Sequence, residues 1–165
     1  MMAHILNVQE LDLVTPPINC WNKQGHGSLD IREAIEQSCN VFFTTIGFEL
    51  GKDSEGNFSE ARSLGMLQKY ASLMGLDQKT GIEISEASPQ VSDKNAVPSY
   101  IGQGTNTFTT SQLARYASTI ATSGTIYKLS LLDRVTDSKG KLIKEYPSET
   151  SWTVGSFQQY LGCHP

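Results

Sequence analysis

The sequence predicts a mainly α-helical, α+β fold that contains one β-hairpin. Apolar residues recur at helical spacing in several stretches, capping boxes precede three of these stretches, and two strand-like runs flank one polar turn. The 165 residues are enough to bury a core. We expect a single domain over 1–165, with an irregular lead-in at 1–19, a core segment at 20–146 and a C-terminal helix at 147–165.

Two helices are predicted on either side of a junction at Ser38-Cys39-Asn40. Asp30 and Glu33 have capping-box spacing, and Ile31, Ala34 and Ile35 follow at helical spacing. A second helix is predicted over Val41–Leu50, with its end at Gly51. We expect the two helices to meet at Ser38-Cys39-Asn40, because Ser and Asn compete with the helix for backbone hydrogen bonds.

A third helix is predicted to follow Asn57, which has capping-box spacing to Glu60. Gly75 is its expected end, and the chain from Leu76 to Ser99 is predicted to be a loop. The apolar residues of this helix recur at helical spacing, namely Ala61, Leu64, Leu67, Ala71 and Met74.

The second half of the chain contains the clearest helical pattern. Thr109 and Gln112 form a capping box, and Gly124 ends the helix. The apolar positions of this helix are Leu113, Tyr116, Ala117, Ile120 and Ala121. A hairpin is then predicted from Ile126–Val135 and Leu142–Tyr146, across Asp137-Ser138-Lys139-Gly140. A last helix is predicted to open at Ser151, with Val154, Phe157 and Leu161 on one side.

Composition and charge exclude several classes of function. The chain has 13 basic and 17 acidic residues and a net charge of −4, without a basic patch, so a nucleic-acid partner is disfavoured. No apolar run approaches the roughly 20 residues that span a bilayer, and the start does not resemble a secretory signal. We therefore expect a soluble chain with no anchor and no membrane contact.

The three cysteines, Cys20, Cys39 and Cys163, do not indicate a metal site by their spacing. An odd number of cysteines cannot all form disulfides within one chain. We interpret them as small buried apolar residues, or as a free terminal thiol in the case of Cys163. No metal and no cofactor are predicted.

Three short strings match the motifs of serine acyl-transfer enzymes that work without a histidine. Such enzymes use Ser-x-x-Lys for the nucleophile and its base, Ser-x-Asn for proton relay and substrate binding, and Lys-Thr-Gly for the substrate carboxylate. The strings here are Ser38-Cys39-Asn40, Lys79-Thr80-Gly81 and Ser138-Lys139-Gly140-Lys141. Their order along the chain differs from the order of the motifs.

Local sequence argues against two of these strings. Ser-x-x-Lys needs one helical turn to bring the amine over the hydroxyl, but Ser138 to Lys141 lie in a predicted hairpin turn. Lys-Thr-Gly must lie on a strand at the site, but Lys79-Thr80-Gly81 lies in a predicted loop. Ser38-Cys39-Asn40 is a weak signal when it is taken alone.

The context of Ser38-Cys39-Asn40 resembles that of one known family. Gly25-His26-Gly27-Ser28-Leu29-Asp30 and Ala34–Phe43 resemble the segment around Ser-x-Asn in class B penicillin-binding proteins. Gly102-Gln103-Gly104 and the helix over Thr109–Gly124 resemble that family's Gly-Gln-Gly loop and the helix after it. Smaller matches at Gly75-Leu76, Thr80-Gly81-Ile82 and Glu86 keep the family order, so the resemblance covers about Cys20 to Tyr146.

The resemblance implies a role for each matching residue. The family cross-links peptidoglycan on D-Ala-D-Ala stem peptides and is acylated by β-lactams. Ser38 would be the proton-relay serine and Asn40 would bind the side-chain amide carbonyl of the substrate. Gly102, Gln103 and Gly104 would have a structural role near the site. His26 is interpreted as a local hydrogen-bonding group between two glycines.

The departures from the family pattern predict a partial domain. No Ser-x-x-Lys precedes Ser38, so the chain offers no nucleophile, and the family's Lys-Thr-Gly strand is expected after the end at Pro165. We therefore expect the helical half of a penicillin-binding transpeptidase or β-lactamase-like fold, with the central sheet largely missing. Such a chain is predicted to be inactive alone and to self-associate through an exposed apolar face.

The parent protein of such a segment would work at the extracytoplasmic face of the bacterial membrane. Two alternatives stay open at this point. One is a β-lactam sensor domain or a serine β-lactamase relative, which share the fold. The other is a helical interaction module without catalytic activity, for which the absent nucleophile is the support.

Overall fold

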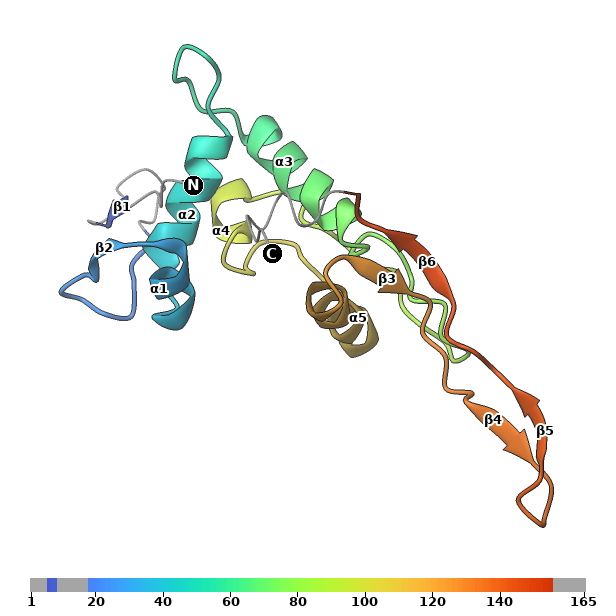
Figure 1. Cartoon of the computed structure of the whole chain (residues 1–165). Helices are drawn as coiled ribbons and strands as arrows, with labels where there is room; N and C mark the ends of the chain where they lie inside the picture. Colours follow the sequence, from blue (N-terminus) through green and yellow to red (C-terminus); the bar gives the residue numbers. More distant parts are fainter. Residues whose placement is uncertain (1–5, 9–17, 156–165) are drawn as a thin grey trace. The chain divides into compact units, whose positions relative to one another are not determined.

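The computed structural model describes residues 6–8 and 18–155, and the chain divides into two compact units. The first unit comprises Met1–Lys69 and Val91–Asn106, and the second comprises Tyr70–Gln90 and Thr107–Pro165. Figure 1 shows that the described elements are mainly helices with short strands, as the sequence predicts for an α+β fold. None of the helices in the described part of the chain is long and apolar enough to cross a membrane.

The first unit contains a two-stranded sheet and helices. Strands β1 (Leu6–Val8) and β2 (Gly27–Leu29) pair antiparallel. Helices α1 (Ile31–Glu36) and α2 (Asn40–Leu50) follow, and α4 (Ala96–Ser99) packs against α2. Strand β1 lies in the segment 1–19 that the sequence predicts to be irregular; most of that segment lies outside the described residues.

The core of the first unit forms around α2 and the junction before it. Its buried members come from five parts of the unit: the chain before β2, β2 itself, α1, the junction between α1 and α2, and α2. They are Cys20, Leu29, Ala34, Cys39, Val41 and Phe42, with Phe43 and Ile46 packed against them. Burial of Cys20 and Cys39 confirms the interpretation of these two residues as buried, while Cys163 lies outside the described residues.

Helix α1 begins as its capping box predicts. The Asp30 carboxylate accepts hydrogen bonds from the backbone N–H groups of Arg32 and Glu33, and Glu33 accepts one from the Asp30 N–H. These bonds satisfy backbone donors that have no partner inside the helix. Helix α2 ends at Leu50 with Gly51 as its C-cap, which confirms the predicted end.

Helix α3 (Glu60–Leu73) begins two residues later than a cap at Asn57 predicts. The Asp53 side chain accepts hydrogen bonds from the backbone of Glu55 and Asn57, so Asn57 belongs to a turn. Glu60 does not reach back to Asn57, because its carboxylate accepts a hydrogen bond from the Ala96 N–H at 3.2 Å. The predicted capping box at Asn57 is therefore wrong, and tertiary contacts are the reason.

The second unit is built on α5 (Thr110–Ala121) and two pairs of strands. Strand β3 (Thr125–Tyr127) pairs antiparallel with β6 (Thr150–Thr153), and β4 (Arg134–Thr136) pairs antiparallel with β5 (Leu142–Glu145). The β4–β5 pair confirms the predicted hairpin, although its strands are shorter than expected. Ile126 and Val154 form the core of the strand pair, with Met74 and Trp152 packed against them.

The predicted helix at Ser151 is wrong where the structure describes it. Thr150–Thr153 form β6, in register with β3, so that Ile126 lies opposite Trp152. Strand β6 pairs with a segment some 25 residues earlier in the chain, and a local sequence pattern does not reveal such a partner. Phe157 and Leu161 lie outside the described residues.

Helix α5 buries its polar side and exposes its apolar side. Its capping box at Thr109 and Gln112 is present as predicted, but its buried side chains are Gln112, Arg115 and Thr119. Leu113 and Ile120, from the predicted apolar positions, keep 48% and 45% of their surface exposed. The apolar stripe of α5 is therefore unpacked within the described chain.

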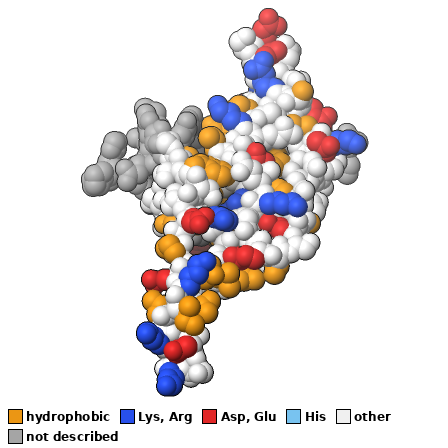
Figure 2. Space-filling model, turned by 90° about the vertical axis from the view of Figure 1, so that its right-hand side faces the viewer, with side chains coloured by type: hydrophobic (Ala, Val, Ile, Leu, Met, Phe, Trp, Pro, Cys, Tyr) orange, Lys and Arg blue, Asp and Glu red, His pale blue; other side chains and the backbone are white. Residues whose placement is uncertain are grey.

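Exposed apolar side chains also occur on the hairpin of the second unit. Figure 2 shows hydrophobic side chains gathered toward the hairpin, among basic and acidic ones. They belong to the strands and to the residues that lead into β4, namely Leu131, Leu132, Val135, Leu142 and Ile143.

Candidate functional site

Ser38 lies in the tight turn that joins α1 to α2, and Asn40 is the first residue of α2. The backbone N–H of Ser38 donates to the Ile35 carbonyl at 3.1 Å, and that of Cys39 donates to the Ala34 carbonyl at 3.0 Å. Ser38 takes a positive φ of 49°, a left-handed conformation that is unusual for a residue other than glycine. The string therefore lies at a helix junction, as predicted, with α2 starting at Asn40.

The turn presents Ser38 outward and holds Asn40 by its side chain. Ser38 is exposed and Asn40 is half-buried. The Asn40 Nδ2 donates to the carbonyl oxygen of Asn19 at 3.4 Å, which ties the start of α2 to the chain before β2. The first N–H groups of a helix have no partner inside the helix, so this end of α2 favours negative charge beside Ser38.

The first turn of α2 is further fixed by a buried threonine. The Thr44 side chain is fully buried, and its hydroxyl donates to the Asn40 carbonyl at 2.9 Å and to the Val41 carbonyl at 3.1 Å. Buried polar groups that are fully hydrogen-bonded make a structure rigid. The position of Asn40 is thus set by its own side chain and by the residue one turn later.

The Gly102-Gln103-Gly104 loop follows α4 and belongs to the same unit. Gly102 and Gly104 have positive φ values of 76° and 85°. A side chain at Gly104 would place its Cβ 2.4 Å from the Ser99 Oγ and 3.0 Å from the Ser92 Oγ, so glycine is required there.

Helix α4 is held against α2 by a close ring contact. A Cβ at Gly47 of α2 would lie 2.4 Å from the Tyr100 ring, and Tyr100 is the C-cap of α4. The Tyr100 hydroxyl donates to the Ser63 carbonyl at 2.9 Å. Tyr100 thus connects the chain that leads into the glycine loop with α2, the helix that begins with Asn40. The structural role of Gly102, Gln103 and Gly104 near the site remains a prediction.

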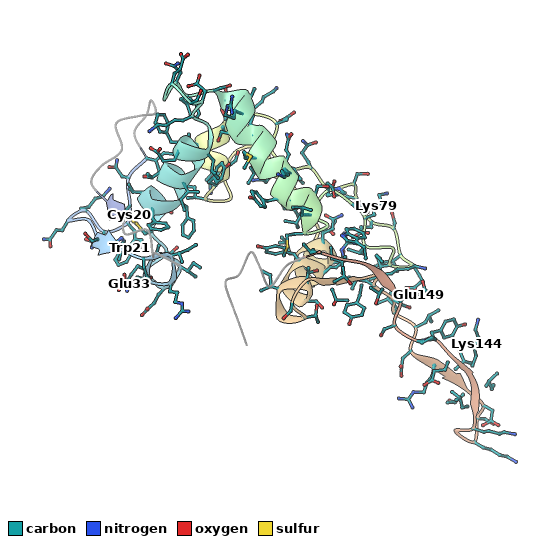
Figure 3. The ribbon with its side chains drawn as sticks, turned by 45° about the horizontal axis from the view of Figure 1, so that its top comes forward. Cys20, Trp21, Glu33, Lys79, Lys144 and Glu149 are labelled. Atoms are coloured by element: carbon teal, nitrogen blue, oxygen red, sulfur yellow. The ribbon has the colours of Figure 1, made fainter. Side chains whose placement is uncertain are left out.

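Lys79-Thr80-Gly81 is not on a strand, which agrees with its prediction as a loop. Thr80 is buried, and its hydroxyl and backbone N–H both donate to the carboxylate of Glu86, at 3.1 and 2.7 Å. Figure 3 labels Lys79 on this loop of the second unit. A threonine that is engaged in this way does not offer its hydroxyl to a substrate.

Glu86 collects hydroxyl donors from the start of α5 as well as from Thr80. The hydroxyls of Ser111 and Thr109 lie 2.8 and 3.2 Å from its Oε1. Burial alone would raise the pKa of Glu86, but hydrogen bonds from Ser111, Thr80 and Thr109 outweigh it and hold the pKa below its ordinary value. Glu86 is therefore a negatively charged group that connects the Thr80 loop to the start of α5 by hydrogen bonds.

Ser138-Lys139-Gly140-Lys141 forms the hairpin turn, as predicted. The Asp137 carboxylate accepts hydrogen bonds from the backbone N–H groups of Lys139 and Lys141, each at 2.9 Å. No helical turn brings Lys141 over Ser138. This string has the geometry of an exposed turn and cannot form a serine–lysine pair.

The structure also reveals a cluster that the sequence does not predict. The ligand atoms of Cys20, His26 and Cys39 all lie within 4.8 Å of one another. The sequence spacings of six and thirteen residues match no familiar metal motif, so only folding brings them together. Figure 3 labels Cys20 in the segment beside β2 and Glu33 on α1.

A cavity of about 400 Å³ adjoins this cluster and is lined by His26 together with Asn22, Gly25, Leu29, Glu33, Glu36 and Gln37. Trp21 packs against His26, with 5.2 Å between ring centroids, and donates its indole N–H to the Gln37 carbonyl at 2.8 Å. His26 thus contacts a ring and a thiol, where the sequence predicts a local hydrogen-bonding group.

Comparison with known proteins identifies the relatives of this chain. The family model described as "Penicillin binding protein transpeptidase domain" matches residues 4–159. Penicillin-binding protein 2A of Bacillus subtilis is 31% identical over 130 residues, which are 72% of this chain and 18% of that protein. Stage V sporulation protein D of the same organism is 27% identical over 117 residues, which are 67% of this chain and 16% of that protein.

Solved structures show the same fold. Penicillin-binding protein 2B from Streptococcus pneumoniae (strain 5204) gives a TM-score of 0.73 at 23% identity and covers 93% of this chain and 28% of its own. The imipenem acyl-enzyme complex of penicillin-binding protein A from M. tuberculosis gives 0.68 at 19% identity, covering 97% and 35%. The chain thus spans less than a fifth of the length of the two B. subtilis proteins, with 18% and 16% covered.

Proposed function

The chain belongs to the penicillin-binding protein transpeptidase family, and from this we propose that it is the part of a class B peptidoglycan DD-transpeptidase that supplies the Ser-x-Asn motif. The observation that carries the proposal is the turn at Ser38, which exposes the serine and fixes Asn40 at the start of α2. The substrate class is the D-Ala-D-Ala stem peptide, and β-lactams occupy the same site. The family match and the names of the relatives favour this over a sensor domain or an interaction module.

Ser38 relays a proton in this proposal and forms no bond to carbon. When a nucleophilic serine attacks the peptide carbonyl, its proton passes to a lysine amine and then through the Ser38 hydroxyl to the departing amine. A hydroxyl can do this because it donates one hydrogen and accepts another at the same oxygen. The exposure of Ser38 at the helix end supports the role, since a substrate can reach it.

Asn40 binds the amide carbonyl of the substrate's side chain in this proposal. Its Nδ2 carries two hydrogens, of which one goes to the Asn19 carbonyl and the other is available to a ligand. The bond to Asn19 also fixes the orientation of the amide group. A donor that is already oriented loses little entropy on binding.

The nucleophile must come from sequence other than these 165 residues. Ser138 begins the sole Ser-x-x-Lys string in the chain, and it lies in the hairpin turn. We therefore expect that the 165-residue chain alone is not acylated by a β-lactam. The full protein acts at the extracytoplasmic face of the membrane in this proposal, because its substrate lies there.

The full protein has the growing peptidoglycan as its partner. Other proteins of cell-wall synthesis are further candidates, because one similar solved structure is described as "Structural coordination of polymerization and crosslinking by a peptidoglycan synthase complex". That structure gives a TM-score of 0.66 at 22% identity, covering 93% of this chain and 26% of its own.

The test is acylation of the full open reading frame by a fluorescent penicillin, followed on denaturing gels. We expect Ser38→Ala to slow acylation by roughly 10²- to 10⁴-fold, the contribution of a general acid–base group. Asn40→Ala should slow it by about tenfold or more, while Ser28→Ala on β2 serves as the control for a serine in the same unit. Acylation at the wild-type rate in Ser38→Ala, or labelling of the 165-residue chain alone, would contradict the proposal.

A further inference from the structure

A tryptophan from the segment before β2 makes a hydrogen bond to the turn that carries Ser38. The indole N–H of Trp21 donates to the carbonyl oxygen of Gln37 at 2.8 Å, across 16 positions of sequence. Figure 3 labels Trp21 in this segment. Two residues earlier, the carbonyl oxygen of Asn19 accepts a hydrogen bond from the Asn40 Nδ2 at 3.4 Å. The segment before β2 therefore contacts the turn on both sides of Ser38.

The peptide group before Ser38 is hydrogen-bonded at both of its ends. This planar group consists of the Gln37 carbonyl and the Ser38 N–H. The carbonyl accepts a hydrogen bond from Trp21, and the N–H donates to the Ile35 carbonyl at 3.1 Å. The next N–H along the chain also donates to a backbone carbonyl, at 3.0 Å. Of these three bonds, the one from Trp21 is made by a side chain, so a substitution can remove it and leave the backbone unchanged.

Fixed peptide groups are important here because the backbone of Ser38 is strained. Its φ of 49° lies in the left-handed region, which costs free energy for a residue that has a Cβ atom. The backbone dihedrals set the direction of the Cα–Cβ bond and the rotamers that the hydroxyl can adopt. A Gln37 carbonyl that is free to rotate would let Ser38 relax toward an ordinary φ and turn its hydroxyl away.

We propose that Trp21 is a positioning residue for proton transfer at Ser38. Its indole holds the Gln37 carbonyl, so that the strained turn keeps the Ser38 hydroxyl in the direction that the proton relay needs. This inference rests on the proposed function, since it assigns a positioning group to the same site. Trp21 touches no reacting atom in this proposal and acts through the backbone of the turn.

The exposure of Trp21 distinguishes this role from that of a core residue. Its side chain lies at the surface, with 64% of its area exposed, and its bond to Gln37 is exposed as well. Water can therefore bind the Gln37 carbonyl when the indole N–H is removed, so that little stability is lost. A water molecule does not fix the direction of the carbonyl. Removal of the N–H should thus affect proton transfer more than folding.

Trp21→Phe tests the proposal in the full protein, because phenylalanine keeps an aromatic ring beside His26 and lacks the N–H. Stopped-flow measurements with a fluorescent penicillin separate its noncovalent binding constant from its acylation rate constant. We expect the acylation rate constant to fall roughly three- to tenfold, the usual contribution of one hydrogen bond, and the binding constant to change by less than about twofold. Trp152→Phe makes the same exchange at the other tryptophan of the chain and should leave both constants unchanged.

Combination with Ser38→Ala shows whether Trp21 acts through Ser38. Without the hydroxyl there is nothing left to position, so Trp21→Phe should slow acylation by less than about twofold in the Ser38→Ala background. Equal factors in the two backgrounds, or a loss confined to noncovalent binding, would overturn the proposal and leave the relay role of Ser38 intact. Wild-type acylation in Ser38→Ala alone would instead refute the proposed function, and this inference with it.

A measurement on the unmodified indole covers the case in which Trp21→Phe does not fold. Proton NMR of the 165-residue chain resolves the indole N–H signals of its two tryptophans, and Trp152→Phe identifies the signal of Trp21. We expect the Trp21 N–H to exchange with water more slowly than that of free tryptophan, because it is hydrogen-bonded. Exchange as fast as in free tryptophan would show that the indole does not hold the turn, and would overturn the proposal.

Discussion

Arg115 of α5 donates a hydrogen bond from Nη2 to the carbonyl oxygen of Gly75, just beyond the end of α3. The same guanidinium also donates to the carbonyls of Gln78 and Lys79, at 2.7 and 2.9 Å. All three carbonyls lie in the chain that follows α3, which ends at Leu73. A buried arginine therefore holds together the loop that contains the Lys-Thr-Gly string.

Removing this arginine should destabilise the second unit strongly. Arg115→Met keeps the length of the side chain but leaves three carbonyls without their charged donor, and we expect the free energy of unfolding to fall by roughly 2–4 kcal/mol. Urea denaturation followed by circular dichroism measures this change. Arg134→Met, on the exposed hairpin, should change it by less than about 0.5 kcal/mol. Equal effects in the two variants would contradict the role of Arg115.

The Glu86 carboxylate should make stability depend on pH in the acid range. Its pKa is lower in the folded chain than in the unfolded chain, so its contribution is fully present above the unfolded value. That contribution is lost as the pH falls through the lowered pKa, where the folded state must take up the proton. Glu86→Gln should therefore be less stable than wild type at neutral pH, and the two should converge at low pH. If the free energies of unfolding of the two proteins differ by the same amount at every pH, Glu86 is not the group that makes stability depend on pH.

The Gly-Gln-Gly loop offers a pair of matched alanine substitutions. Gly104→Ala adds a methyl group 2.4 Å from the Ser99 Oγ at a positive φ, while Gly102→Ala has a similar φ and nothing within 4 Å. We expect a loss of about 1–2 kcal/mol for Gly102→Ala, from backbone strain alone. Gly104→Ala should lose a further 1–3 kcal/mol or so from crowding. Thermal unfolding compares the two, and equal losses would exclude crowding at Gly104.

The left-handed backbone at Ser38 allows the effect of this residue on stability to be measured apart from its proposed role as a proton relay. Ser38→Gly should fold as well as wild type or slightly better, because glycine adopts positive φ without strain. Ser38→Val should lose about 1–2 kcal/mol, since a β-branched residue is disfavoured there. Differential scanning calorimetry measures both variants. If glycine is the more damaging of the two, the turn does not have the backbone described here.

The exposed stripe of α5 should drive self-association at high concentration. Leu113 and Ile120 lie on this stripe, and unpacked apolar surface of this kind favours pairing with a second copy. Light scattering at millimolar protein should detect dimers or larger species, and Ile120→Lys should reduce them. Ile84→Lys, at an exposed loop position in the same unit, is the control. A monomer at millimolar concentration would contradict the prediction.

Sequence reasoning succeeded where the determining contacts are local. The capping boxes at Asp30 and Thr109 and the end of α2 at Gly51 involve residues within one turn of each other, so their spacing predicts them. The sequence predicts the helix junction at Ser38 for the same reason, because Ser38 and Asn40 themselves compete with the helix for backbone hydrogen bonds.

Prediction failed where distant residues compete. Glu60 binds the backbone of Ala96 in place of Asn57, and Thr150–Thr153 find a strand partner in Thr125–Tyr127. The cluster of Cys20, His26 and Cys39 is a further case, because a spacing along the chain does not encode a distance in space. The polar buried face of α5 was missed because Arg115 finds its partners 36 to 40 residues away.

The bond between Thr80 and Glu86 has a consequence for motif searches in related genomes. A text match to Lys-Thr-Gly says nothing of whether the threonine hydroxyl is available to a ligand. In this chain the hydroxyl of Thr80 is already bound to the carboxylate of Glu86, six positions downstream, so the matching letters do not make a substrate-binding strand.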